Sequence, residues 1–190
     1  MLIDDSIIEG CVAGKRSAQS ALYLKYSSVM LAVCLRYAQN RDEAEDILQE
    51  AFLKIFQHIS TYRKEGSFEG WMKRIMINHA LNYYRKNRKL PFHENIESIN
   101  EMEIMELEEP QAVHAPVSAE KLLALIQKLP PGYRLVFNMF VFEEYSHKEI
   151  SEALAISENT SKSQLLKARK MLRNRLFELK ILQNTAPINE

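Results

Sequence analysis

The sequence predicts an all-α protein made of two small helical domains joined by an acidic linker. Apolar residues recur at spacings of three and four residues through most of the 190-residue chain. Only 5 glycines and 6 prolines interrupt this pattern, too few for the many tight turns of a β-rich fold. Hydrophobic residues make up 46% and charged residues 26%, as expected of a chain that buries a core.

The charges divide the chain into three segments, although the formal net charge is zero. Residues 1–90 hold 14 Lys and Arg against 10 Asp and Glu, and residues 121–190 hold 11 against 7. Between them, residues 91–120 hold 8 Glu and no Lys or Arg, and three prolines break the helical pattern. We therefore expect a domain at 1–90, a linker at 91–117 and a domain at 118–190. Two mildly basic domains suit a polyanionic partner, which the linker would repel.

The N-terminus and the cysteines bear on location. The chain opens with an acidic stretch that lacks the basic and apolar parts of a signal peptide. Its longest apolar run, Val29 to Leu35, is too short to span a bilayer. Cys11 and Cys34 have no metal-ligand spacing, so we expect reduced, buried thiols. These features predict a cytoplasmic protein that is not itself a membrane protein.

The first domain reads as four helices. Residues 1–38 contain two, the second with Ser17 as its expected N-cap and with Tyr23, Tyr26, Met30, Val33 and Tyr37 at helical spacing. Residues 40–59 form a third, with acidic side chains in the first turn, where the helix dipole favours them. Residues 60–68 read as a loop, and residues 68–89 as a fourth helix ending in a basic cluster.

The helix at 40–59 has two distinct faces. Its apolar stripe is Ala44, Leu48, Ala51 and Ile55, whereas a second face carries Asp46, Gln49, Glu50, Leu53 and Gln57. An acidic face is unsuited to DNA but could dock a basic protein surface. An ordinary solvated face explains the same residues.

The helix at 68–89 combines aromatic, amide and basic side chains on one face: Trp71, Ile75, Asn78, Asn82, Arg85 and Lys89, with Tyr62 and Phe68 just before them. Bases stack on aromatic rings while cations follow phosphates, so this face suits single-stranded nucleic acid. The alternative is that Phe68, Trp71 and Ile75 belong to the core, and that the basic run from Arg85 to Lys89 is merely solvated.

The second domain also reads as four helices, at residues 118–129, 133–142, 146–155 and from 157 towards 179, with Pro130, Pro131 and Gly132 expected to stop the first. Ser146 and Glu149 fit a capping box, and Ser157 is positioned to cap the last helix. The very short turn between the last two helices predicts a helix-turn-helix, although many such turns carry Gly where this chain has Ala155.

The second helix of such a motif places its N-terminal half in the major groove. We expect its buried stripe to be Leu165, Ala168, Leu172 and Leu176, and its exposed positions to be Asn159, Thr160, Lys162, Ser163, Gln164, Leu166 and Lys167. Lys, Gln and Ser can hydrogen-bond base edges, and Leu can touch a thymine methyl group. A solvated basic face is the alternative.

Three segments together resemble the sigma factors of bacterial RNA polymerase: AEDILQEAFLKIF, GSFEGWMKRIMINHALNYYRKNRK and LPPGYRLVFNMFVFEEYSHKEISEALAISENTSKSQLLKARKML. The two-domain layout resembles the extracytoplasmic-function (ECF) subfamily of the sigma-70 family. The resemblance covers roughly residues 10–90 and 118–178.

The resemblance implies a role for each candidate residue. The first domain would bind core polymerase through Asp46, Gln49 and Glu50. It would also capture and melt the downstream promoter element through Tyr62, Phe68, Trp71, Asn78, Asn82 and Arg85. The second domain would read the upstream element through Thr160, Lys162, Ser163, Gln164, Leu166 and Lys167. Gln164 stands where the family often has Arg, and Ser161 where Val is frequent.

The resemblance also implies partners: core RNA polymerase, promoter DNA and an anti-sigma factor, which in this family is often membrane-bound. The acidic linker would thread the polymerase channel. We expect no cofactor, no metal and no catalytic residue, because the five histidines are scattered and no phosphate loop or hydrolase motif occurs. A ligand-sensing helix-turn-helix repressor and a protein-only interaction module are the other classes to separate from this one.

Overall fold

The computed structural model describes residues 5–87, 112–113, 117–179 and 182–183. The chain forms two compact units, Met1–Lys89 and Leu90–Glu190. Their long elements are all helices, which confirms the all-α prediction. Among the described residues the only strands are β1 (Ala112–Val113) and β2 (Leu182–Gln183), a short antiparallel pair that the sequence did not predict. The predicted linker, apart from β1 and residue 117, lies outside the described residues.

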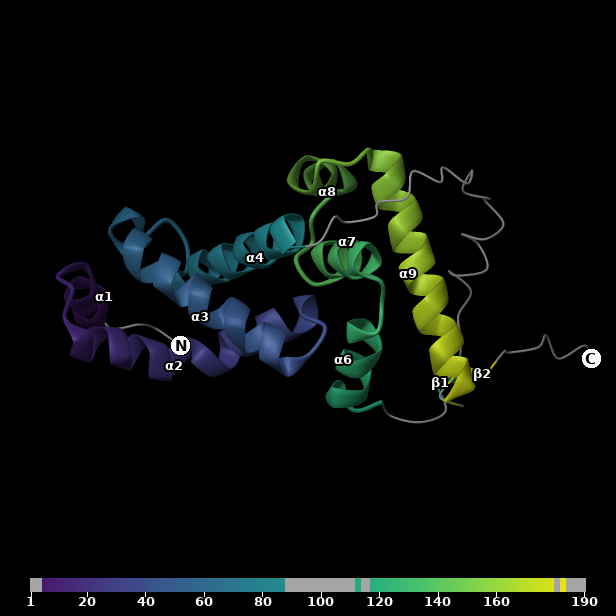
Figure 1. Cartoon of the computed structure of the whole chain (residues 1–190), viewed down its shortest axis with the longest axis horizontal. Helices are drawn as coiled ribbons and strands as arrows, with labels where there is room; N and C mark the ends of the chain where they lie inside the picture. The colour runs from purple at the N-terminus through teal and green to yellow at the C-terminus, as the bar shows by residue number, and fades with distance from the viewer. Residues whose placement is uncertain (1–4, 88–111, 114–116, 180–181, 184–190) are drawn as a thin grey trace, which may run out of the picture. The chain divides into compact units, whose positions relative to one another are not determined.

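The first unit is a bundle of three long helices with a short fourth (Figure 1). Helix α1 (Asp5–Val12) packs on α2 (Arg16–Tyr37), and α2, α3 (Arg41–His58) and α4 (Phe68–Asn87) each pack against the other two. A 3₁₀ turn, η1 (Ile59–Thr61), follows α3 directly. The largest fully buried side chains of this unit are Leu22, Met30, Tyr37, Ile47, Ile55, Met72, Met76 and Tyr84.

The turn between α1 and α2 corrects one prediction. Ser17 does not cap α2, because the helix begins at Arg16 and its N-cap is Lys15, which makes no side-chain capping bond. Gly14 adopts a φ of 71° and closes α1 in a Schellman motif, in which Lys15 N donates to Gly10 O (2.9 Å) and Gly14 N to Cys11 O (3.0 Å). This tight reversal places Ser17 inside the first turn of α2.

The start of α3 is tied to α4 by hydrogen bonds. Asn40 caps α3 by accepting from Glu43 N at 2.8 Å. The Glu43 carboxylate accepts from Gln39 N (2.5 Å) and from the Tyr84 hydroxyl (2.6 Å). The acidic first turn predicted from the sequence therefore also fixes α3 against its neighbour.

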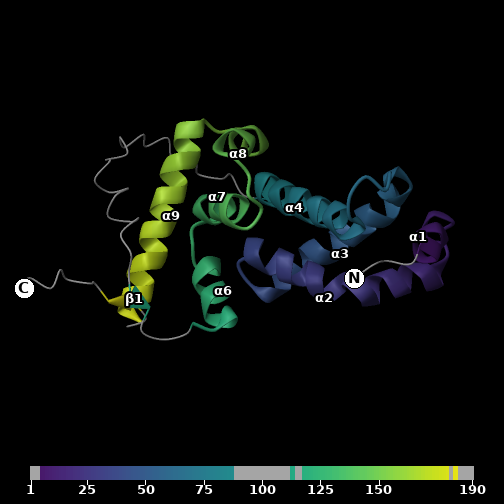
Figure 2. The same ribbon diagram turned by 180° about the vertical axis from the view of Figure 1, so that it is seen from behind.

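The second unit consists of α6 (Ala119–Gln127), α7 (Pro131–Val141), α8 (His147–Leu154) and α9 (Glu158–Glu178). The long helix α9 packs against the other three (Figure 2). Pro131 begins α7 instead of only ending α6, since a proline at the first helical position leaves no backbone donor unpaired. Fully buried Arg134 donates to the carbonyl of Gln127 (2.8 Å), near the end of α6.

The helix-turn-helix capping signals are confirmed. Ser146 Oγ accepts from Glu149 N (3.2 Å) while Glu149 Oε2 accepts from Ser146 N (2.8 Å), which completes the capping box. Ser157 Oγ accepts from Thr160 N at 3.0 Å and caps α9. Between the helices, Ala155 takes the left-handed conformation, with φ 55° and ψ 48°. Ala155 therefore occupies the backbone conformation that glycine usually adopts in such turns.

Replacing Ala155 by Gly should stabilise the second unit. A left-handed alanine is strained by about 1–2 kcal/mol, and the extra unfolded-state entropy of glycine cancels part of the gain. We expect a net increase of about 1 kcal/mol in the free energy of unfolding, measured by circular dichroism in urea. Ala153→Gly, inside α8, is the matched control and should destabilise by about 1 kcal/mol. Equal destabilisation by both substitutions would show that the turn is not strained.

Candidate nucleic-acid and protein interfaces

The acidic face of α3 is exposed as predicted. The apolar stripe of Ala44, Leu48, Ala51 and Ile55 is buried, whereas Asp46, Gln49, Glu50, Leu53 and Gln57 are all exposed. Leu53 has 62% of its surface exposed within this polar surrounding. A cavity of about 300 Å³ between α2 and α3 is lined in part by Gln49 and Glu45. The face can thus offer carboxylates together with an apolar contact to a protein partner.

An aromatic cluster joins α2, the loop before α4 and the start of α4. Phe68 lies between Tyr26 and Tyr62, with ring centroids 6.1 and 5.0 Å away, and stacks on Trp71 at 5.5 Å. Phe68 is only 4% exposed, so for this residue the core alternative is the correct description in the free protein. Trp71 is half-buried, with its centroid 5.6 Å from that of Tyr62, and therefore keeps a surface that a base can reach.

The loop beside this cluster is held in a fixed shape. The Tyr62 hydroxyl donates to Gly66 O at 2.8 Å, and Lys64 and Gly66 both have positive φ, 61° and 94°. Lys64 Nζ contacts Asp5 Oδ2 of α1 at 2.8 Å, and this hydrogen bond raises the pKa of Lys64. The loop borders a cavity of about 510 Å³, lined by Asp5, Ile8, Tyr26, Tyr62, Lys64, Gly66, Ser67, Phe68, Glu69, Gly70 and Lys73.

The polar residues of α4 follow the same face towards its C-terminus. Asn78, Asn82 and Arg85 are exposed, and Ile75 is half-buried. Residues 88 and 89, at the end of the predicted basic cluster, lie outside the described residues. The described face therefore offers a half-buried indole, then amides, then a cation, which is an order suited to an unpaired strand.

The recognition half of α9 departs from the prediction at two positions. Thr160 and Gln164 are only 8% and 5% exposed, so the expectation that they are exposed is wrong. The Thr160 hydroxyl is paired with the capping Ser157 hydroxyl at 2.8 Å, which turns this edge of α9 inward. Asn159 and Lys162 are exposed, and Ser163, Leu166 and Lys167 are half-buried. Thr160 and Gln164 are thus not available to base edges in the free protein.

His147, the first residue of α8, is half-buried and packs inside the helix-turn-helix. His147 Nδ1 lies 2.9 Å from the hydroxyl of Ser161, which is fully buried, and the His147 ring stacks on Phe140 with centroids 4.8 Å apart. The guanidinium of Arg169 lies 5.7 Å from the centroid of Phe140. The only sequence signal for this contact was Ser161, a polar residue where the family often has Val.

Stability of the second unit should fall in mild acid because of His147. Burial lowers the pKa of His147, Lys162 and Arg169 lower it further, and Glu158 opposes them. Because the folded-state pKa lies below the unfolded value, this stabilisation is present above about pH 6.5 and is lost as the pH falls through the folded-state pKa. His147→Asn should flatten the pH dependence of urea unfolding. The pKa of His79 is also lowered, but His79 is present in both the wild type and the variant. Its contribution to the pH dependence therefore cancels when the two curves are compared. Parallel curves for the two proteins would contradict this.

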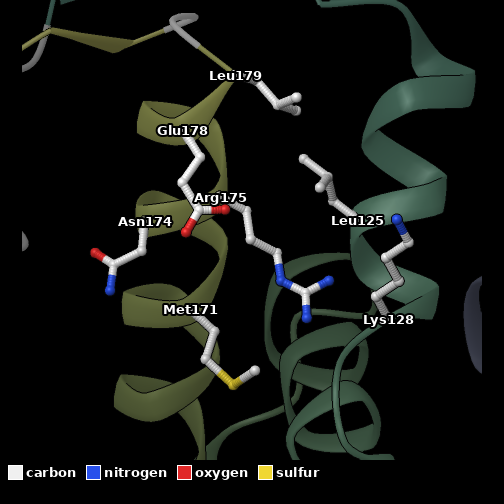
Figure 3. Close-up of a pocket in the computed structure, with 7 residues that line it drawn as sticks. All are labelled: Leu125, Lys128, Met171, Asn174, Arg175, Glu178 and Leu179. Carbon is white, nitrogen blue, oxygen red and sulfur yellow. The ribbon is translucent and has the colours of Figure 1, made fainter.

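The far end of α9 borders a groove that the sequence did not indicate. Its volume is about 560 Å³, and Leu125, Lys128, Met171, Asn174, Arg175, Glu178 and Leu179 line it. Figure 3 shows Met171 and Arg175 pointing from α9 towards α6. Leu172 and Leu176, predicted as buried, are only half-buried on this part of α9. The prediction for these two residues was wrong because the apolar stripe of α9 continues beyond the part of the helix that packs closely against its neighbours.

The described residues contain no group of three or more His, Cys, Asp or Glu side chains that could hold a metal ion. Within the same part of the chain, no helix is both long and apolar enough to cross a membrane.

Comparison with known proteins gives a consistent result for both units. Residues 22–90 match the family model for sigma-70 region 2, and residues 119–172 match that for sigma-70 region 4. The ECF RNA polymerase sigma-E factor of Haemophilus influenzae is 25% identical over 185 residues, which cover 94% of this chain and 97% of that protein. The RNA polymerase sigma-H factor of Pseudomonas aeruginosa is 25% identical over 176 residues, covering 89% and 91%. The sigma factor RpoE of Bartonella quintana, solved in complex with the anti-sigma factor NepR, shares the fold, with a TM-score of 0.51, 16% identity and coverage of 83% and 96%.

Proposed function

Since the chain belongs to the extracytoplasmic-function group of sigma-70 RNA polymerase sigma factors, we propose a division of labour between its two units. The chain is a transcription initiation factor that directs core RNA polymerase to promoters. The acidic face of α3, through Asp46, Gln49 and Glu50, binds the polymerase. The aromatic cluster and α4 hold unpaired bases of the downstream element, and α9 reads the upstream element as duplex. The corresponding segments are residues 1–90, a linker at 91–117, and 118–190.

The observation that carries this proposal is the exposed face of α9, which is the second helix of the capped helix-turn-helix. The capping box at Ser146 and the left-handed Ala155 set α8 and α9 in the geometry of the motif. Lys162 is exposed and Ser163, Leu166 and Lys167 are partly exposed, so cations, a hydroxyl and an apolar contact face the same way. Thr160 and Gln164 act behind this surface by supporting the cap and the packing of α9.

The mechanism is differential binding, with no catalytic step of the chain's own. Upstream contacts fix the register on duplex DNA. Capture of unpaired bases by the first unit then stabilises the open state over the closed one, at about 1–3 kcal/mol per stacked base. Such a factor works in the cytoplasm, where it meets polymerase and DNA. The complex of the Bartonella relative with an anti-sigma factor supports a partner of that kind here.

Run-off transcription tests the proposal against a helix-turn-helix repressor. Core polymerase is given a pool of random upstream fragments, with and without this protein. We expect factor-dependent transcripts whose templates share two spaced sequence elements. DNA binding without any factor-dependent transcript, together with no binding to core polymerase, would instead establish a repressor.

A further inference from the structure

Helix α4 has two polar side chains on a buried face that is otherwise apolar. The apolar members are Phe68, Met72, Met76, Ile77, Ala80 and Leu81, and the polar ones are His79 (6% exposed) and Tyr84 (fully buried). A buried polar group is costly unless it has a partner. Each of the two reaches a different glutamate of α3.

The first of these contacts is structural. The Tyr84 hydroxyl donates to Glu43 Oε2 at 2.6 Å, and Glu43 is itself only 8% exposed. Because both groups are buried, this bond holds α3 and α4 together and leaves nothing for a partner protein to touch.

The second contact links the core to the surface. His79 Nε2 lies 3.0 Å from Oε2 of Glu50, whose side chain is 62% exposed on the acidic face of α3. The two atoms are at contact distance although they fall short of full hydrogen-bond geometry, and no hydrogen bond to either ring nitrogen of His79 is found among the described residues. The Glu50 carboxylate is the acidic group that lies against this buried ring.

We propose that His79 is a positioning residue of the polymerase-binding face: its Nε2 lies against one carboxylate oxygen of Glu50 and leaves the other for polymerase. This inference rests on the proposed role of α3. A side chain that is already oriented loses less rotational freedom on binding. Without the contact, Glu50 would sample several rotamers at a solvent-exposed position.

The groups around the imidazole suit this role. Burial lowers the pKa of His79, Lys54 lowers it further, and Glu50 opposes them. The imidazole is therefore neutral at neutral pH, and with its proton on Nε2 it can orient Glu50 without cancelling the carboxylate charge. A lysine at this position would neutralise the carboxylate that a basic partner surface attracts.

A double-mutant cycle tests the role of His79. The dissociation constant for core polymerase is measured for the full chain, His79→Leu, Glu50→Gln and the double variant, with thermal unfolding recorded for each. We expect His79→Leu to weaken binding about three- to tenfold, which is the range for freeing one side chain. In the Glu50→Gln background the same change should have no further effect. His79→Gln, which keeps an N–H at similar reach, should restore most of the affinity.

Asp46→Asn is the matched control, because Asp46 lies on the same face of α3 but His79 pairs with Glu50 instead. Its effect should add to that of His79→Leu. If His79→Leu weakens binding equally in the Glu50→Gln background, or not at all in the wild type, His79 is only a packing residue and the inference is wrong. If Glu50→Gln and Asp46→Asn both leave polymerase binding unchanged, the proposed role of α3 is wrong, and the positioning role of His79 fails with it.

Discussion

The double variant Lys162→Glu, Lys167→Glu should bind upstream-element DNA at least about 100-fold more weakly while keeping its fold. Each lysine is expected to make a charge-assisted bond to a phosphate or a base edge, worth about 1.5–3 kcal/mol. Two such losses amount to at least about 3 kcal/mol, or about two powers of ten in affinity. The slope of log affinity against log salt concentration should also fall by about 0.9 for each phosphate that the variant no longer neutralises. Fluorescence anisotropy on a selected promoter duplex, repeated at several salt concentrations, measures both quantities.

The matched control places the same charge change elsewhere in the second unit. Lys121 and Lys128 are both exposed, at α6 and outside the helix-turn-helix. Lys121→Glu with Lys128→Glu alters the net charge equally, so it should reduce DNA binding only through the weak long-range field. If the two double variants reduce the affinity for upstream-element DNA to the same extent, α9 is not the helix that binds this element.

Replacing Trp71 by Ala should impair promoter opening more than closed-complex formation. The indole packs one face on Phe68 and remains half-exposed, so it can take a base on its outer surface. Losing one stacked base costs about 1–3 kcal/mol, which shifts the open-to-closed ratio by about 5- to 150-fold. Permanganate reactivity of unpaired thymines reports opening, and a gel-shift assay of the polymerase complex at low temperature reports closed-complex binding.

Tyr83→Ala is the aromatic control on the same helix. Tyr83 is also half-buried, but it packs edge-on against Tyr84 with ring centroids 5.6 Å apart and is not part of the Trp71 cluster. Tyr83→Ala should therefore leave promoter opening unchanged. Should Trp71→Ala reduce opening, closed-complex binding and thermal stability together, Trp71 acts mainly as a core residue. Thermal unfolding of both variants separates these cases.

Each unit has a structural feature that extends beyond the segment matched by its family model. In the first unit, α1 contributes Asp5 and Ile8 to the cavity beside the loop before α4, although α1 lies outside the matched region 2 segment, residues 22–90. In the second, the matched segment ends at residue 172, before most of the groove-lining residues of α9. Both features thus lie partly outside the segments that the family models match.

The sequence alone determined the long helices, the caps at Ser146 and Ser157, and the family. Apolar spacing placed every long helix, and the serines at positions 118, 146 and 157 marked three helix starts that the structure confirms. These signals are local, because a capping bond joins residues three apart and a helical stripe repeats within two turns. The exposed face of α3 followed from the same kind of pattern.

Only the tertiary structure decided which way α9 turns about its own axis and what the buried polar groups touch. A helical pattern fixes a stripe only to within about one residue, and the neighbouring helices choose the final rotation. The Ser157 and His147 contacts therefore drew Thr160 and Ser161 inward, and Gln164 is buried on the same side. The pairing of His79 with Glu50 and the meeting of Tyr26, Tyr62 and Trp71 around Phe68 join residues from different elements of the unit. No local spacing encodes such contacts, because they depend on how whole helices pack against one another.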